Sequence, residues 1–458
     1  MSIITDVDSY KVGMFLQYPP KTEYISSYIE SRGSDDPDYD ESVFFGIQYW
    51  IKEYLMKPVT IEDLDEAKVV FELHGEPFPY DGWKYIIDEY DGFLPLTIEA
   101  VQEGSILPLS NVLAQVVNTD PKCYWLTTWV ETSLLRTIWY ATTVATNSRT
   151  IKKELKKFYD KSGSVQGLDF KLHDFGSRGV SSKESAGIGG LAHLVNFMGT
   201  DTIESVMFGR KYYNIDMAGF SIPASEHSTI TTWGKDNENK AFENMLNQFT
   251  DYPIIACVSD SYNIYNAVDE MWGKEFKDRI LNGNQTLVVR PDSGNPLTVP
   301  IIVIEKLMDK FGYSMNNKGY RTLPDNIRVI QGDGITKNSI KDILTNMDAH
   351  KLSLDNLAFG MGSGMLQQVN RDTLKFAMKA SAICIDGKWS DVWKDPIEGG
   401  KQSKRGILGL YHNENTEWQT ERKIEFSDPF NGLKLVYING ISYLNDNFES
   451  IRNRARID

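Results

Sequence analysis

The 458-residue sequence predicts an α/β protein, with an irregular, TIM-like α/β barrel and a second domain built on a mixed or antiparallel sheet. Two observations predict this fold class. Between residues 254 and 374, an apolar strand, a turn rich in Gly or Asp and a helical pattern follow one another four times, which is typical of parallel strands joined by crossover helices. Between residues 380 and 458, two segments alternate around a turn, as antiparallel hairpins do.

The length of the chain favours two domains. We expect a discontinuous sheet domain made of residues 1–165 and 366–458, and a barrel made of residues 166–365 with its active site at the carboxyl ends of the strands. Residues 123–163 read as a long, largely helical region with one buried face.

Composition excludes several classes of protein. A net charge of −15 argues against nucleic acid as the main partner, because backbone phosphates demand a basic surface. The three cysteines, Cys123, Cys257 and Cys384, are too far apart for a disulfide framework or a CxxC metal site. The sequence shows neither a signal peptide nor a run of about 18 apolar residues, so we expect a cytoplasmic protein without a membrane segment.

Each of the four repeats ends in residues that suit a phosphate or a ribose. Asp260 follows the first strand, Arg290 and Asp292 lie in RPDSGNP after the second, Asp333 lies in QGDG after the third, and glycines 360–364 follow the fourth. Each loop taken alone also fits an ordinary turn or helix cap. Because the carboxyl ends of barrel strands carry the active site, we expect these residues to converge on one mouth.

The segment SIPASEHSTITTWGK contains one of only six histidines, His227, directly after Glu226. Pro223 predicts a loop or bend here. A single histidine does not make a metal site, which needs several ligands. A nucleophilic histidine needs a carboxylate to hold its tautomer, and Glu226 or Asp260 could serve. Alone, the segment fits a surface histidine better than a catalytic one.

Three further segments have both a functional and a structural interpretation. In KLHDFGSRGVSS, Phe175 and Arg178 could bind a ligand that has a flat ring and an anionic group. The structural alternative is a loop with a surface arginine. Asp201 in GTDT suits a ligand contact or a helix cap. The basic residues of 394–405 suit a phosphate site or a solvated face.

Taken together, long segments resemble the nicotinamide phosphoribosyltransferase family, in order from about residue 5 to about residue 410. They include TDVDSYKVGMFLQYPP, KLHDFGSRGVSSKESAGIGGLAHLVNFMGTDT, PASEHSTITTWGKD, VSDSYNIYNA, RPDSGNP and RVIQGDGI. The resemblance implies a type II phosphoribosyltransferase fold and a homodimer with shared active sites. It implies the reaction of nicotinamide with phosphoribosyl pyrophosphate, giving nicotinamide mononucleotide and pyrophosphate. It also implies ATP as co-substrate, Mg²⁺, and phosphorylation of a histidine, which falls on His227.

The resemblance also implies roles for residues around the ring and the ribose. The pyridine ring would lie between Phe175 and Tyr10 of the partner subunit, and Asp201 would accept the amide N–H while repelling the carboxylate of nicotinate. The implied catalytic residues are His227, Asp260, Asp292, Arg290 and Glu226. Asp292 and Asp333 would contact the ribose hydroxyls or Mg²⁺, and Asp260 and Asp292 would be the Mg²⁺ ligands. Arg290 would also lie near the ring.

The remaining implied roles concern phosphates. The donor phosphate would be held by Arg178, Gly332, Gly362, Ser363 and Gly364, with Arg371 and Lys379 supplied by the other subunit. Pyrophosphate or ATP would meet Arg32, Lys394 and Lys401.

Three alternatives remain open from the sequence. Ser177 and Ala377 stand where the family has an aromatic residue and a serine, and these smaller side chains are compatible with a larger donor, ADP-ribose pyrophosphate, which would give NAD directly. A non-enzymatic nicotinamide- or nucleotide-binding regulator would predict loss of the acids, which are present. Nicotinate as acceptor is the third alternative.

Overall fold

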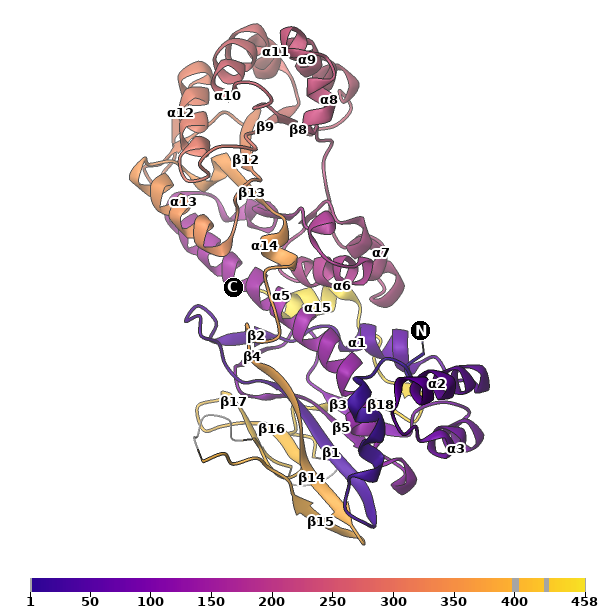
Figure 1. The fold of residues 1–458 in the computed structure, drawn as a ribbon. Helices are drawn as coiled ribbons and strands as arrows, with labels where there is room; N and C mark the ends of the chain where they lie inside the picture. The colour runs from indigo at the N-terminus through magenta and orange to yellow at the C-terminus, as the bar shows by residue number, and fades with distance from the viewer. Residues whose placement is uncertain (1, 398–402, 424–427, 458) are drawn as a thin grey trace.

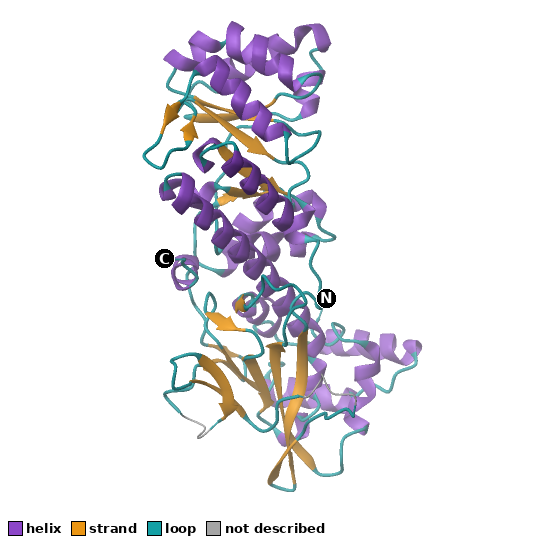
Figure 2. Cartoon of the chain, turned by 90° about the vertical axis from the view of Figure 1, so that its left-hand side faces the viewer, coloured by secondary structure: helices purple, strands orange, loops and turns teal. Residues whose placement is uncertain are grey.

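The structure is a computed structural model that describes residues 2–397, 403–423 and 428–457. The antiparallel sheet and the barrel lie at opposite ends of an elongated molecule (Figure 1). Between them lie helices α5 (Glu131–Ser162), α6 (Lys183–Leu194) and α15 (Phe448–Arg454). The second view shows the barrel strands enclosed by helices and the large sheet more open (Figure 2). The predicted combination of an α/β barrel with an antiparallel sheet domain is therefore confirmed.

The large sheet has seven antiparallel strands in the order β15-β14-β1-β5-β3-β18-β19. Both predicted hairpins belong to it, and each turns through two residues with positive φ: Asp386–Gly387 at 51° and 74°, and Asn439–Gly440 at 46° and 83°. This geometry matches the right-handed twist of the paired strands. The strands are β1 (Thr22–Ser31), β3 (Leu96–Ala100), β5 (Val112–Asn118), β14 (Phe376–Ile385), β15 (Lys388–Asp391), β18 (Lys434–Ile438) and β19 (Ile441–Ser442).

Helix α5 (Glu131–Ser162) connects the two ends of the molecule. It lies within residues 123–163, which the sequence predicts to be largely helical. Its first part packs Leu134 and Ile138 into the core beneath the large sheet, whereas Val144 and Leu155 belong to the barrel core. Smaller elements complete this part: η1 (Ser9–Leu16), β2 (Glu41–Val43), α1 (Ile47–Trp50), η2 (Ile51–Leu55), α2 (Ile61–His74), α3 (Tyr80–Tyr90), β4 (Ile106–Pro108), η3 (Pro121–Cys123), α4 (Leu126–Trp129), β16 (Leu408–His412) and β17 (Trp418–Arg422).

The barrel sheet has six parallel strands in the order β7-β6-β13-β12-β9-β8. The alternation of apolar strands with helices in the sequence produces this parallel sheet, because two neighbouring parallel strands must be joined by a crossover connection, usually a helix. The strands are β6 (Leu172–Asp174), β7 (Gly199–Thr200), β8 (Ile254–Val258), β9 (Thr286–Arg290), β12 (Ile327–Gln331) and β13 (Leu357–Met361).

An irregular segment, residues 220–225, closes the barrel between its edge strands β7 and β8. On one side, the Phe220 N–H donates to the Met198 carbonyl at 2.7 Å. On the other, the Ala256 N–H donates to the Pro223 carbonyl at 2.9 Å, and the Ser225 N–H to the Ala256 carbonyl at 3.0 Å. Pro223 has no N–H, so it fits this partly paired position. The closure brings His227, two residues later, to the barrel mouth.

The barrel helices surround this sheet, and α15 also packs on the barrel core, where the Phe448 ring contacts Phe45 and Tyr213. Among the described residues, no helix is long and apolar enough to cross a membrane. The remaining elements are η4 (Val165–Phe170), η5 (Ser177–Gly179), α6 (Lys183–Leu194), α7 (Ile203–Tyr212), α8 (His227–Thr231), η6 (Lys235–Asn237), α9 (Glu238–Gln248), α10 (Ile264–Asn266), η7 (Ala267–Glu275), α11 (Lys277–Asn282), α12 (Val299–Phe311), β10 (Ser314–Met315), β11 (Arg321–Thr322), α13 (Lys337–Ala349), η8 (Leu354–Asn356), α14 (Ser363–Leu366) and α15 (Phe448–Arg454).

Candidate active site

The strand ends of the barrel sheet meet at one mouth. Asp260 follows β8, Asp292 follows β9, and the Asp292 N–H donates to the Asp260 carboxylate at 3.0 Å. Phe175 follows β6, and its N–H donates to the Met361 carbonyl at the end of β13. Gly332, after β12, lies against both Asp292 and Phe175. Parallel strands in register produce this convergence because all their carboxyl ends share one edge.

His227 lies at this mouth, at the first position of α8. Its Nε2 is 3.5 Å from Asp292 Oδ2 and 3.7 Å from Asp260 Oδ1, and its Nδ1 is 3.2 Å from Ser261 Oγ. The side chain is 44% exposed, so a ligand in solution can reach it. Two carboxylates near one ring nitrogen and a hydroxyl at the other suit a histidine that becomes charged.

Asp260 is the most buried acid of this group. Its side chain is 3% exposed, and its Oδ2 accepts hydrogen bonds from the Asp292 N–H and the Ser293 hydroxyl. Its Oδ1 has no hydrogen-bond partner among the described residues. Arg290 instead pairs with Asp292, at 2.9 Å. A buried carboxylate oxygen without a partner is costly, and a cation or a charged histidine would compensate for it.

Glu226, the other carboxylate predicted for His227, points elsewhere. It accepts a hydrogen bond from the Ser228 hydroxyl, and no contact with the His227 ring appears in the described structure. The geometry therefore assigns the neighbouring carboxylates to Asp260 and Asp292. A further acid, Glu238, is buried close by, and its pKa is raised to about 7, mainly by burial and then by the charge of Asp260.

A cavity of about 370 Å³ runs into the barrel from the mouth. Phe175, Asp201, Ser221 and Arg290 line its outer part. The Ser221 hydroxyl donates to Asp201 Oδ1, and the other oxygen of Asp201 accepts nothing from the described residues. The edge of the Phe175 ring crosses Gly360, where an added Cβ would fall 1.9 Å from Cε2. The outer cavity therefore offers a ring face, a free carboxylate oxygen and a guanidinium.

The inner part of this cavity contains buried titratable side chains, among them Lys171 and His173. Lys171 donates to the carbonyls of Leu354 and Leu357 at 2.8 and 3.0 Å, and burial lowers its pKa to about 7. Burial also lowers the pKa of His173, whose Nε2 lies 2.9 Å from the Phe170 carbonyl oxygen. Burial therefore favours the uncharged forms of both side chains.

The phosphate residues predicted after β13 and β6 lie together. The Ser363 hydroxyl donates to the Gly179 carbonyl at 3.4 Å, and a Cβ on Gly179 would fall 2.5 Å from that hydroxyl. Arg178, next to Gly179, is exposed and makes no ion pair among the described residues. Gly362 and Gly364 flank Ser363. Asp333 is exposed on the adjacent loop.

A second, basic cavity of about 220 Å³ lies on the sheet domain. It collects Arg32, Arg371, Lys379 and Lys394, four of the phosphate-binding residues that the resemblance implies. Lys401 lies outside the described residues.

The acids that line the basic cavity are already paired. Glu30 pairs with Lys404, and Glu131 with Lys11 at 2.6 Å. Tyr10 is 64% exposed, and the Lys11 ammonium that pairs with Glu131 lies 5.4 Å from the centroid of its ring. The cavity therefore keeps a net excess of cations.

The two cavities share no lining residue, so one chain does not bring the predicted site residues to a single place. The barrel cavity has the ring and ribose residues, and the basic cavity has phosphate residues from another part of the chain.

Sequence reasoning did not single out three serines that hold the site acids and histidine. Ser221 bonds Asp201, Ser261 bonds His227, and Ser293 bonds Asp260. Ser261 and Ser293 each directly follow a strand-end aspartate, and that adjacency was a usable signal. Ser221 offered none, because its partner is 20 residues away.

Two protein-family models match parts of this chain. Residues 2–98 match the model of the nicotinamide phosphoribosyltransferase N-terminal domain, and residues 170–430 match the nicotinate phosphoribosyltransferase (NAPRTase) family. A nicotinamide phosphoribosyltransferase of Xanthomonas campestris is 48% identical over 91% of this chain and 88% of its own, and one of Acinetobacter baylyi is 30% identical over 98% and 96%.

Among solved structures, the nicotinate-nucleotide pyrophosphorylase of Pyrococcus furiosus has a TM-score of 0.61 at 16% identity, covering 99% of this chain and 94% of its own. This likeness shows the fold, which is the type II phosphoribosyltransferase fold that the resemblance implies. By these sequence matches, the chain belongs to the nicotinamide phosphoribosyltransferase family.

Proposed function

We propose that the protein transfers the phosphoribosyl group of phosphoribosyl pyrophosphate to nicotinamide, giving nicotinamide mononucleotide and pyrophosphate. The observation that carries the proposal is the barrel cavity, where the Phe175 ring, the free oxygen of Asp201 and Arg290 surround space for a flat, neutral ring. The free oxygen of Asp201 would accept the amide N–H of nicotinamide. Nicotinate would place a carboxylate against Asp201, so the site discriminates against it by repulsion.

The chain's own residues then stabilise the separation of charge. The pyridine nitrogen attacks C1′ with its own lone pair, so no general base is needed. The bond from C1′ to the pyrophosphate oxygen breaks, and the ribose gains oxocarbenium character. Cationic side chains stabilise the leaving pyrophosphate. Arg178 and the loop Gly362–Gly364 would hold the 5′-phosphate.

Asp260 and Asp292 fit a Mg²⁺ ion. The buried Asp260 Oδ1 has no partner, and Asp292 lies beside it. The described residues contain no group of three or more protein ligands that could hold a metal, but Mg²⁺ in phosphate sites is often held by one or two carboxylates together with substrate oxygens. When bound, Mg²⁺ would neutralise phosphate charge. Asp333 would contact the ribose hydroxyls.

His227 would couple ATP hydrolysis to synthesis. Its Nε2 attacks the γ-phosphorus of ATP, the bond to the bridging oxygen breaks, and ADP leaves; water later cleaves the P–N bond. Ser261, 3.2 Å from Nδ1, would hold the proton on that nitrogen. Asp260 and Asp292 would stabilise the cationic ring. The phosphoryl group adds acceptor oxygens at the mouth and favours the ordered, synthetic state.

A homodimer with shared active sites is supported by the separation of the two cavities. Within one chain, the basic cavity and Tyr10 lie apart from the barrel mouth. In the proposed dimer, Tyr10 of one subunit would cover the ring of nicotinamide at the other, and Arg371 and Lys379 would reach its donor phosphate. A two-fold interface produces two such sites at once.

The competing donor, ADP-ribose pyrophosphate, has less support. Ser177 donates to Glu204 at 3.0 Å, so its hydroxyl already has a role in the structure. The relatives carry the name of the mononucleotide-forming activity. The cytoplasm is the proposed compartment, and it is consistent with three buried, free cysteines.

To test this function, the enzyme is incubated with nicotinamide or nicotinate and with phosphoribosyl pyrophosphate or ADP-ribose pyrophosphate, with and without ATP. The mass of the product is then measured. We expect nicotinamide mononucleotide from nicotinamide and phosphoribosyl pyrophosphate, at a rate that ATP increases. His227→Ala should keep basal synthesis and lose the ATP stimulation. The matched control is His74→Ala, an exposed histidine at the end of α2, which should behave as the wild type. Formation of NAD alone, or full ATP stimulation of His227→Ala, would contradict the proposal.

A further inference from the structure

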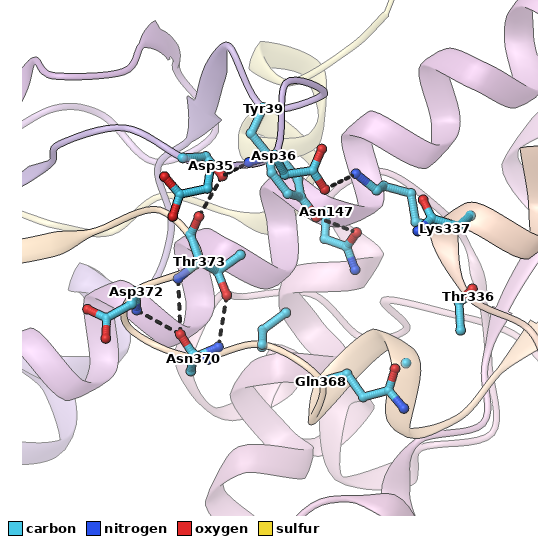
Figure 3. Close-up of a pocket in the computed structure, with 14 residues that line it drawn as sticks. Asp35, Asp36, Tyr39, Asn147, Thr336, Lys337, Gln368, Asn370, Asp372 and Thr373 are labelled. Carbon is cyan, nitrogen blue, oxygen red and sulfur yellow. Dashed lines mark hydrogen bonds and ion pairs between the residues drawn. The ribbon is translucent and has the colours of Figure 1, made fainter.

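The last residue of β6, Asp174, is a fully buried acid that no cation neutralises. Its Oδ1 accepts a hydrogen bond from the Gly176 N–H at 2.7 Å, and it forms no ion pair with the described residues. Acids in more open places are paired: at the edge of a cavity of about 410 Å³, for example, Asp36 binds Lys337 (Figure 3). An unpaired carboxylate in the interior is unfavourable for folding, so Asp174 calls for another explanation.

Asp174 lies next to the two residues that the proposed function assigns to the ring and the amide of nicotinamide. Phe175 follows it in the chain, and the Asp174 carbonyl accepts the Asp201 N–H at 2.9 Å. Successive strand residues point to opposite faces, so His173 lines the barrel cavity and Asp174 points toward the helices. There, a Cβ added to Gly190 of α6 would fall 3.0 Å from Asp174 Oδ2. The carboxylate is therefore enclosed on the helix side of the strand, behind the ring and amide contacts.

The charges of Asp174 and Asp201 act on each other. Burial raises the pKa of Asp174 to about 6, with opposing contributions from the Thr202 side chain and the Gly176 N–H and a smaller increase from the charge of Asp201. This pKa lies below neutral pH, so Asp174 is ionised there. Its negative charge then adds to that of Asp201 where the carboxylate of nicotinate would lie.

The other side chains that pack around Asp174 carry no charge at neutral pH. From the helices these are Ser205 of α7 and Leu366 of α14, which lie beside it together with Gly190. From α5, Tyr140 faces it, and burial followed by the charge of Asp174 raises the pKa of this phenol, so it stays neutral. The charge of Asp174 therefore acts mainly on Asp201 and on an anion bound beside it.

We propose that the carboxylate of Asp174 contributes to acceptor specificity: its charge, together with that of Asp201, rejects nicotinate. The inference rests on the proposed function, because it assumes that the acceptor ring lies against Phe175 and Asp201. An amide at position 174 would keep the hydrogen bond to the Gly176 N–H without burying a charge. The carboxylate is thus the less stable choice for folding, and rejection of anions is what its charge adds.

The test compares Asp174→Asn with the wild type. The values of kcat/KM for nicotinamide and for nicotinate are measured with phosphoribosyl pyrophosphate from about pH 5.5 to about pH 8. Because both acceptors use the same donor, the ratio of the two values cancels titrations that affect the donor alone. The ratio for the wild type should rise at least about threefold as Asp174 ionises, whereas Asp174→Asn should lack this rise and have the lower ratio at about pH 8.

The matched control is Glu103→Gln. Glu103 is also buried, and burial raises its pKa to about 7, but it does not line the barrel cavity. This variant should keep the ratio of the wild type and its pH profile. Denaturant unfolding at about pH 8 should find Asp174→Asn at least as stable as the wild type, because the variant no longer buries a charge.

A ratio that Asp174→Asn leaves unchanged at about pH 8 would overturn the proposal. So would a ratio that falls only because nicotinamide reacts more slowly, since that result would show a merely structural role. The wild-type profile needs no variant, and a ratio that stays constant with pH would also overturn the proposal. Conversion of nicotinamide with a ratio insensitive to Asp174 would leave the proposed function intact, whereas conversion of neither acceptor would refute that function and this inference with it.

Discussion

Gly360→Ala tests whether the Phe175 ring is held in place for a substrate ring. An added Cβ would fall 1.9 Å from Phe175 Cε2, whereas ordinary contact begins at 3.4 Å. The ring edge must therefore withdraw by about 1.5 Å, and displacements near 1 Å in a reacting complex can cost about 100-fold in rate. We expect kcat/KM for nicotinamide to fall by about 100-fold, and the free energy of unfolding to fall by about 1–3 kcal/mol from overpacking.

The assay is steady-state kinetics with nicotinamide varied at saturating donor, beside denaturant unfolding. The double variant Gly360→Ala/Phe175→Leu separates the two effects. It removes the clashing ring, so stability should recover by at least half while kcat/KM for nicotinamide stays low. A Gly360→Ala enzyme with kcat/KM for nicotinamide within about threefold of wild type would refute the assignment of Phe175 to the ring.

Two other changes give separate expectations. Asp201→Asn should remove the repulsion of nicotinate, so the ratio of kcat/KM for nicotinamide to that for nicotinate should fall at least about tenfold; an unchanged ratio would remove Asp201 from discrimination. Burial raises the pKa of Glu103 to about 7, so the folded state binds more protons than the unfolded state between pH 4.5 and 7, and stability falls as pH rises through that window. The free energy of unfolding should fall by about 3 kcal/mol across this window. In denaturant titrations at about pH 5 and about pH 8, Glu103→Gln should show a smaller difference in this free energy than the wild type; an equal difference in the variant would contradict the burial argument.

The repeated strand-turn-helix pattern was sufficient to predict the barrel and the residues at its mouth. Asp260 and Asp292 follow strands of this pattern, and the parallel register determines where such residues lie. Phe175 follows β6, outside the four repeats, and its place beside the substrate ring was implied only by the family resemblance. The two hairpins could also be predicted, because Asn-Gly and Asp-Gly favour a tight turn whatever the rest of the chain does.

Contacts between residues that are far apart in the sequence could not be predicted in this way. The closing segment 220–225 has no strand pattern, and it joins β7 and β8 through a few backbone hydrogen bonds. The choice of Asp260 and Asp292 over Glu226 as neighbours of His227 depends on side-chain direction, and adjacency in sequence was misleading there.

The shared active site is tested most directly by complementation between two inactive variants. Asp292→Ala disables the barrel mouth, and Arg371→Ala disables the basic cavity. If each site uses the mouth of one subunit and Arg371 of the other, random mixed dimers restore one intact site in half of the dimers, or about 25% of wild-type activity. A site shared between subunits predicts that recovery from two variants that are each inactive alone. Mixtures that stay inactive, although mixed dimers form, would contradict the shared site.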